Sequence, residues 1–205
     1  MRRPGGYPGR MAARRRWLLV LALAFVSATG SAFALSGRAT SRTLYIDGDS
    51  LAVGTGWYLS TYIHGWTIHG TVAVSRHAYQ GAAAIVERAR EGLLERVVVV
   101  DLGTNDDPGA VSTFAGYVRN VVRAAGPSRC VIWSTINRPP YEGVSYSGYN
   151  SALRSLDTRY RNLHVFDWAA LARAHPEWFG SDGVHPTNAG YRARASGLAR
   201  LVKSC

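Results

Sequence analysis

The sequence predicts an α/β protein with three layers, in which a mostly parallel sheet of five strands lies between two layers of helices. Short runs rich in β-branched and aromatic residues alternate along the chain with segments whose apolar residues recur at helical spacing. The run at 97–102 is almost entirely valine, which is typical of a central strand buried on both faces. Such alternation indicates βαβ units, and hence a parallel sheet covered by helices on both sides.

The expected elements follow one another in a regular order. Strands are expected where short apolar runs stop at turn residues, at 43–47, 66–74, 97–102, 130–136 and 163–166. Helices are expected where one face is apolar, at 50–64, 78–94, 114–125 and 188–203. The segment 137–147 contains Pro139, Pro140 and Gly143 and is expected to be a loop. It follows a strand, so it should lie above the carboxyl edge of the sheet, where open α/β sheets bind ligands.

The first 34 residues resemble a secretory signal rather than part of the fold. Residues 1–16 contain six arginines and no acid, an apolar run follows at 17–26, and small residues lead to Ala34. We therefore expect a signal peptide at 1–34, a short linker at 35–42 and one domain at 43–205. The alternative is an uncleaved membrane anchor, but the apolar run is shorter than the ~20 residues that a span needs. Residues 14–18 also resemble a twin-arginine signal.

Removal of this leader changes the charge of the chain and the partners expected for it. The whole chain has 24 basic and 13 acidic residues and a formal net charge of +11. Without the six leader arginines, 18 basic residues remain and the net charge falls to +5, which is ordinary for a domain of this size. No run of basic residues with interleaved aromatics remains, so we expect no nucleic-acid partner. We expect a secreted or extracytoplasmic monomer with no stable membrane span, no cofactor and no metal.

Three short motifs supply side chains that could carry chemistry, and each is expected at a strand end or in a loop. They are Gly-Asp-Ser at 48–50, Gly-Thr-Asn-Asp at 103–106 and Asp-Gly-Val-His at 182–185. Together they provide a hydroxyl nucleophile, an amide donor and an Asp/His pair, which are the groups that acyl transfer through a serine needs. Each has a simpler interpretation alone: Ser50 and Asp182 as helix caps, and Asn105 as a turn residue. Their combination in this order is what points to an active site.

In this order, the three motifs resemble blocks I, III and V of the SGNH (GDSL) hydrolase superfamily. The resemblance covers nearly all of residues 43–203 and implies a flavodoxin-like α/β/α fold. It implies that Ser50 is the nucleophile, His185 the general base and Asp182 the acid that orients it. Asn105 would donate its side-chain amide to the oxyanion, together with the backbone N–H of Ser50.

Block II of the superfamily departs from the usual pattern in this chain. It should supply a glycine whose backbone N–H is the third oxyanion donor. Its position after the second strand, six residues before Gly81, places Ser75 there instead. A backbone N–H does not require glycine, so Ser75 can serve if it tolerates the required backbone angles. Gly81 is the alternative donor.

The segment 165–186 resembles a narrower group, the extracytoplasmic SGNH domains associated with membrane O-acyltransferases that modify cell-surface glycans. The first hypothesis is therefore an exported serine esterase that forms an acyl-enzyme on Ser50, acting on a small-molecule or glycan ester. The second is an O-acyltransferase, in which a sugar hydroxyl replaces the hydrolytic water. A catalytically silent glycan-binding domain is the third, although binding alone would not need all four site residues.

The topology also predicts a disulfide between Cys130 and Cys205. The turn at 182–185 must lie beside Ser50 at the carboxyl edge of the sheet, so the following helix runs antiparallel to the strands. Its ~16 residues cover about 24 Å, which is close to the length of a strand of six or seven residues. Cys205 should therefore reach the amino edge, where Cys130 begins the fourth strand, and an oxidising compartment would allow them to bond. Two unrelated thiols are the alternative.

Overall fold

In the computed structural model, which describes residues 42–205, five parallel strands form one sheet in the order β2-β1-β3-β4-β5. The strands are β1 (Thr43–Gly48), β2 (Thr67–Val72), β3 (Val97–Asp101), β4 (Cys130–Ser134) and β5 (Leu163–Phe166). The α/β class and the five-stranded parallel sheet are confirmed. The expected signal peptide at 1–34, and the linker at 35–42 except for its last residue, lie outside the described residues.

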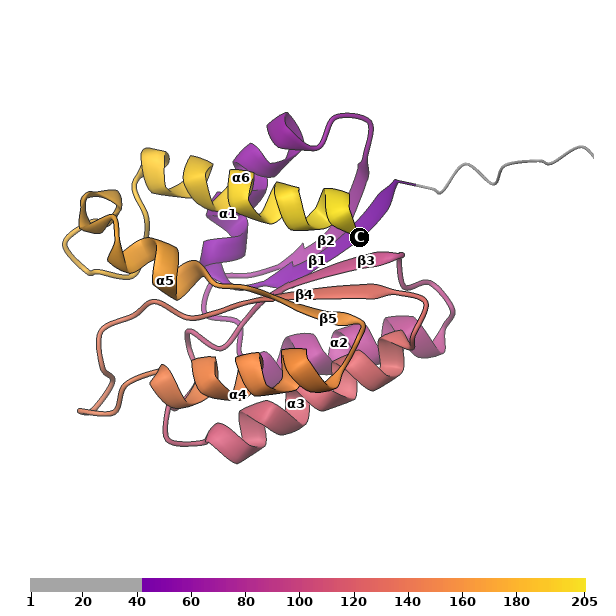
Figure 1. Ribbon diagram of the computed structural model, residues 1–205, viewed down its shortest axis with the longest axis horizontal. Helices are drawn as coiled ribbons and strands as arrows, with labels where there is room; N and C mark the ends of the chain where they lie inside the picture. Colours follow the sequence, from indigo (N-terminus) through magenta and orange to yellow (C-terminus); the bar gives the residue numbers. More distant parts are fainter. Residues whose placement is uncertain (1–41) are drawn as a thin grey trace, which may run out of the picture. The chain divides into compact units, whose positions relative to one another are not determined.

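Helices cover both faces of the sheet, which gives the three layers (Figure 1). The helices are α1 (Ser50–Tyr62), α2 (Ala78–Arg90), α3 (Val111–Ala125), α4 (Ser147–Arg159), α5 (Trp168–Arg173) and α6 (Asn188–Ser204), with a short 3₁₀ turn at Pro176–Trp178. One face packs against α2, α3 and α4, and the other against α1, α5 and α6. No helix between residues 42 and 205 is both long enough and apolar enough to cross a bilayer.

The core consists of two apolar clusters, one on each side of the sheet. All five residues of β3 are buried, and its valines alternate between the clusters: Val98 and Val100 belong to one, Val97 and Val99 to the other. This alternation follows from the two-residue period of a strand. The valine run thus forms the centre of the molecule, as its composition indicates.

Some boundaries differ from those expected from the sequence. Helix α2 ends at Arg90 rather than at residue 94, because Gly92 adopts a positive φ of 74° that does not continue the helix. Leu93, expected on its buried face, is 57% exposed. Helices α4 and α5 were not expected as separate elements. Helix α4 is mainly polar, and only Tyr149, Leu153 and Leu156, at helical spacing, carry its apolar signal.

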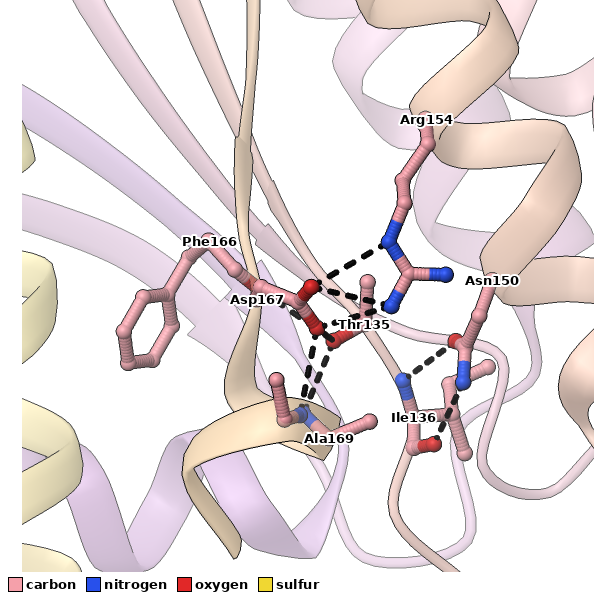
Figure 2. Close-up of polar contacts among 8 residues, drawn as sticks. Thr135, Ile136, Asn150, Arg154, Phe166, Asp167 and Ala169 are labelled. Atoms are coloured by element: carbon pink, nitrogen blue, oxygen red, sulfur yellow. Dashed lines mark hydrogen bonds and ion pairs between the residues drawn. The ribbon is translucent and has the colours of Figure 1, made fainter.

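Polar side chains fix the carboxyl ends of β4 and β5 to these two helices (Figure 2). The side chain of Asn150 bonds both backbone groups of Ile136: it accepts from the N–H at 2.7 Å and donates to the carbonyl at 2.9 Å. Asp167 accepts three hydrogen bonds from Arg154 and one from the Thr135 hydroxyl. The backbone at Ile136 is therefore held at the point where the loop 137–147 begins.

Cys130 and Cys205 form a disulfide, with a distance of 5.9 Å between their Cα atoms. Cys130 is the first residue of β4, and Cys205 directly follows α6. Helix α6 does run from the carboxyl edge back to the amino edge of the sheet (Figure 1), which is the geometry argued from the topology. The bond links two segments 75 residues apart in sequence.

Replacing both cysteines with alanine should lower the free energy of unfolding by about 4 kcal/mol, the value that chain entropy assigns to a loop of this length. Urea unfolding of the oxidised protein and the double variant measures the difference. Reduction of the disulfide in the wild-type protein should lower the free energy of unfolding by most of the same amount. Two free thiols per chain in the denatured, unreduced protein would contradict the bond.

Candidate active site

The sequence of strand connections brings two of the three motifs together. Strand β2 lies on one side of β1 and β3 on the other, so the chain direction across the sheet reverses between β1 and β3. Ligands of open α/β sheets bind at the carboxyl ends of strands at such a switch point. Ser50 begins α1 two residues after β1, and Asn105 follows β3 by four residues. The close approach of the two strands requires Gly48, because a Cβ there would lie 2.9 Å from the Asp101 carbonyl oxygen.

Ser50, His185 and Asp182 form a continuous hydrogen-bonded chain. The Ser50 Oγ lies 2.9 Å from the His185 Nε2, and the His185 Nδ1 lies 2.7 Å from an oxygen of the Asp182 carboxylate. Both distances are within hydrogen-bond reach without any movement of the chain. The side chains of His185 and Asp182 are 50% and 51% exposed, so the chain of three lies open to solvent.

The turn at 182–185 fixes the orientation of this pair. The second carboxylate oxygen of Asp182 accepts the backbone N–H groups of Val184 at 2.9 Å and His185 at 3.0 Å. The hydrogen bond from the His185 ring and these two backbone donors lower the pKa of Asp182 to about 2. The carboxylate therefore stays ionised at neutral pH and favours the tautomer of His185 that carries its proton on Nδ1.

Ser75 occupies a backbone position that normally favours glycine. The Arg76 N–H donates to the Ala73 carbonyl at 3.3 Å, which makes residues 73–76 a β-turn. Ser75 is the third residue of this turn and has a φ of 60°, the conformation that makes glycine common there in type II turns. Within the described part of the chain, the Ser75 N–H has no hydrogen-bond acceptor. The structure thus allows the serine to replace the expected glycine.

Gly81, the alternative donor, lies inside a helix. Its N–H donates to the His77 carbonyl at 3.3 Å, in the first turn of α2. The residue is buried against Asp47 and Leu102, and a side chain at this position would collide with both. The glycine is thus explained by close packing, and its N–H is already bonded.

The side-chain amide of Asn105 lies among these groups. Its Nδ2 donates to the Arg76 carbonyl at 3.2 Å and to the Asp49 carboxylate at 3.4 Å. Both bonds are long, and they hold the amide nitrogen between the Ser75 turn and the start of α1. An incoming oxyanion would be a stronger acceptor than the carbonyl, because hydrogen bonds to charged oxygens are shorter and stronger.

Three buried carboxylates lie at the ends of the strands around Ser50. Asp47 forms two hydrogen bonds with Arg76, at 2.8 and 3.2 Å, and Asp101 is paired with the buried Arg194 of α6. Asp49 has no arginine of its own: it accepts the Leu51 N–H at 2.9 Å as the N-cap of α1. Burial, with the nearby negative charge of Asp101, raises the pKa of Asp49 to about 7.

Two pockets adjoin near Ser50. One, of about 330 Å³, is lined by Ser50, Asn105, Arg138, Pro139, Pro140, Tyr141, Asp182, Val184 and His185. The other, of about 370 Å³, is lined by Ser75, His77, Asn105, Asp106, Asp107, Arg138, Tyr141 and Tyr146. Asn105, Arg138 and Tyr141 border both. All five site residues expected from the sequence, including Ser75, therefore line these two adjoining pockets.

Arg138 and the arginines that pair with the buried carboxylates were not expected as site residues from the sequence. Arg76 directly follows Ser75, and this position was the available signal. Arg194 lies in a helix whose buried face is otherwise formed by small and aliphatic residues, so the hydrophobic pattern assigns the arginine to solvent. Such a pattern carries no information about a buried carboxylate on a strand that is distant in the sequence.

Between residues 42 and 205, one group of side chains has spacing suited to a metal: Cys130, His164 and Cys205, whose ligand atoms lie within 4.8 Å of one another. The two sulfur atoms are bonded to each other here, and a disulfide sulfur is not the thiolate that binds metals. The group also lies at the amino edge of the sheet, away from Ser50.

The raised pKa of Asp49 predicts a pH-dependent stability. Its folded pKa of about 7 exceeds its usual 3.8, so the folded protein binds the proton more tightly than the unfolded chain does. This stabilisation is complete below about pH 4 and is lost as the pH rises through 7. Between pH 5 and 7.5 the free energy of unfolding of the wild-type protein should fall by on the order of 1–3 kcal/mol more than that of Asp49→Asn. Urea unfolding of both proteins at the two pH values checks this. Equal changes would contradict it.

With this geometry, the comparisons with known proteins can be interpreted. None of the curated proteins compared with the chain matches it in sequence. Among solved structures, the C-terminal catalytic domain of peptidoglycan O-acetyltransferase A from Streptococcus pneumoniae superposes with a TM-score of 0.68 at 21% identity, covering 80% of this chain and 94% of that domain. A putative acylhydrolase from Bacteroides fragilis gives a TM-score of 0.62 at 18% identity, with 80% and 87% covered. A carbohydrate esterase of family 3 from Talaromyces cellulolyticus gives 0.61 at 17% identity, with 80% and 99% covered.

At these identities the structural neighbours establish the fold, and the sequence match establishes the family. A model of the GDSL-like lipase/acylhydrolase family matches residues 47–193, which include the Gly-Asp-Ser motif at 48–50 and the Asp/His turn at 182–185. The chain belongs to the GDSL-like lipase/acylhydrolase family and is an ester hydrolase of the SGNH type.

Proposed function

We propose that the protein cleaves an O-acyl ester through an acyl-enzyme formed on Ser50. The observation that carries this proposal is the hydrogen-bonded chain from Ser50 through His185 to Asp182, at 2.9 and 2.7 Å. It supplies a nucleophile, a base and a group that orients the base.

In the first half-reaction, the Ser50 Oγ attacks the ester carbonyl carbon, and the His185 Nε2 takes the hydroxyl proton. The carbonyl oxygen becomes an oxyanion, which the N–H groups of Ser50 and Ser75 and the amide of Asn105 would bind. Collapse of this intermediate breaks the bond to the alcohol oxygen, which receives the proton from His185. In the second half-reaction, water attacks the acyl-enzyme with His185 again as base, which releases the acid and restores Ser50.

A glycan ester is the proposed substrate, and an extracytoplasmic location is proposed with it. The open position of the site supports this, since half of the His185 and Asp182 side chains is exposed and a bulky alcohol has access. The names of two structural neighbours refer to carbohydrates: one is a peptidoglycan O-acetyltransferase and the other is a carbohydrate esterase. The leader-like sequence at 1–34 and the disulfide support export.

The similarity to an O-acetyltransferase domain favours one second candidate, acyl transfer to a sugar hydroxyl. The chemistry differs only in the second half-reaction, where a sugar hydroxyl replaces water. Incubation with an acetyl ester and an excess of an oligosaccharide separates the two candidates, because transfer yields an acetylated saccharide and hydrolysis yields acetate alone.

A fluorophosphonate probe tests the proposed mechanism directly. Peptide mapping should find the adduct on Ser50, and the variants Ser50→Ala and His185→Ala should remain unlabelled. Circular dichroism of both variants checks that they fold. Labelling of another serine would place the nucleophile elsewhere.

Kinetics of the site variants should follow their roles. Ser50→Ala and His185→Ala should lower kcat by on the order of 10³ or more, because the nucleophile or its base is lost. Asn105→Ala should cost roughly 10²–10³, which is typical of a lost oxyanion donor. Asp182→Asn should cost less than loss of His185, since Asp182 orients the base and transfers no proton itself. Hydrolysis of p-nitrophenyl esters measures each effect, and substantial activity of Ser50→Ala would exclude the mechanism.

Variants of Ser75 separate the role of its backbone from that of its hydroxyl. If only the backbone N–H acts, Ser75→Gly and Ser75→Ala should retain substantial activity, and glycine fits a φ of 60° without strain. Ser75→Pro should lose activity, because proline lacks the N–H and cannot adopt a positive φ. Loss of activity in Ser75→Gly would assign the role to the hydroxyl, and full activity in Ser75→Pro would remove this residue from the oxyanion site.

A further inference from the structure

Arg138 is the basic side chain that borders the nucleophile. It lines the pocket of about 330 Å³ that contains Ser50 and His185. It also lines a pocket of about 300 Å³ beside α4, which Arg154 and Arg173 border and to which no Asp or Glu contributes. The guanidinium thus borders both the pocket of the reacting groups and this recess, in which Arg154 is already paired with Asp167.

Within residues 42–205, Arg138 forms no ion pair. Its Nη1 donates to the Thr104 carbonyl, and no carboxylate oxygen lies within ion-pair distance of its guanidinium. The other arginines near the strand ends differ, since Arg76 is paired with Asp47 and Arg194 with Asp101. Asp106 and Asp107 line the 370 Å³ pocket with Arg138, but neither carboxylate is within ion-pair distance of its guanidinium. Asp106 accepts the Ala78 N–H and lies 3.4 Å from the His77 Nδ1, and Asp107 accepts the Gly109 N–H.

The backbone around Arg138 is held in place before any ligand binds. Ile136, two residues earlier, is fixed by the paired hydrogen bonds of Asn150 (Figure 2). Two prolines follow at once, and they restrict the chain further. The guanidinium carbon also lies 5.9 Å from the centre of the Tyr141 ring. A side chain that is already positioned loses less conformational entropy when it binds a ligand.

We propose that Arg138 binds an anionic group, a carboxylate or a phosphate, on the alcohol part of the substrate. The proposal rests on the mechanism above. His185 must protonate the departing alcohol oxygen, so the alcohol part lies on the side of His185, in the pocket that Arg138 shares. A guanidinium without a counter-ion is suited to both oxyanions, because its planar N–H groups match their geometry. The preferred substrates are then acyl esters of acidic sugars.

Three acetyl esters that differ in one group test this: the mono-O-acetylated methyl glycosides of glucose, glucuronic acid and glucose 6-phosphate. The wild-type protein should hydrolyse at least one charged ester with a kcat/KM about 10–100-fold above that of the neutral ester, as one charge-assisted hydrogen-bonded pair allows. The better of the two charged esters identifies the anion. The advantage should lie mainly in KM and should fall as NaCl is added.

Arg138→Ala should lower kcat/KM for the preferred charged ester about tenfold or more relative to that for the neutral ester, while Arg138→Lys should keep part of the preference. Arg161→Ala is the matched control: it removes one positive charge near Cys205, at the far edge of the sheet, and should keep the full preference.

Equal kcat/KM values of the wild-type protein for all three esters would overturn the proposal. So would an equal loss on all three in Arg138→Ala, which would assign Arg138 to support of the Thr104 loop. If no ester is cleaved and the fluorophosphonate leaves Ser50 unlabelled, the proposed mechanism fails, and this inference fails with it.

Discussion

The arrangement of the site depends on the burial of carboxylates at the carboxyl ends of β1 and β3. Asp47, Asp49 and Asp101 are all removed from water, which is costly unless each charge is compensated. Arg76 compensates Asp47 and so holds the turn that contains Ser75. Arg194 compensates Asp101 and so holds α6, which begins three residues after His185. The charges that surround Ser50 thus also connect the segments that carry Ser75 and His185.

Asp49 has a different part in this arrangement. It caps α1 at the residue before Ser50 and accepts one hydrogen of the Asn105 amide, so it is bonded on both sides of the site. Burial raises the pKa of Asp47 as well, but Asp49 also lies near the negative charge of Asp101 and has only the more distant Arg194 to offset it. A pKa near 7 is the result. The group that contacts the Asn105 amide is thus sensitive to pH, because it is buried beside Asp101.

Much of the fold and the proposed catalytic set could be predicted from local sequence. The valine run of β3 and the motifs at strand ends carry strong signals, since each depends on neighbours in the chain. The boundaries of α2, and the existence of α4, depended on weaker signals: a glycine with positive φ, and three apolar residues on a polar helix. The Asp47–Arg76 and Asp101–Arg194 pairs could not be predicted, because their residues lie far apart in the sequence, by 29 and 93 positions respectively. The positive φ of Ser75 likewise depends on a turn whose anchor, Asp47, lies on another element.

The disulfide makes the stability of this domain a function of the redox potential around it. It ties the end of α6, the helix that follows His185, to the start of β4. A contribution of about 4 kcal/mol corresponds to a change of roughly a thousandfold in the ratio of folded to unfolded molecules. In a reducing compartment the dithiol chain would therefore open far more often. After transfer to an oxidising compartment, the same chain would become much harder to unfold. The proposed export requires this order, because a chain crosses a translocon unfolded and must be stable afterwards.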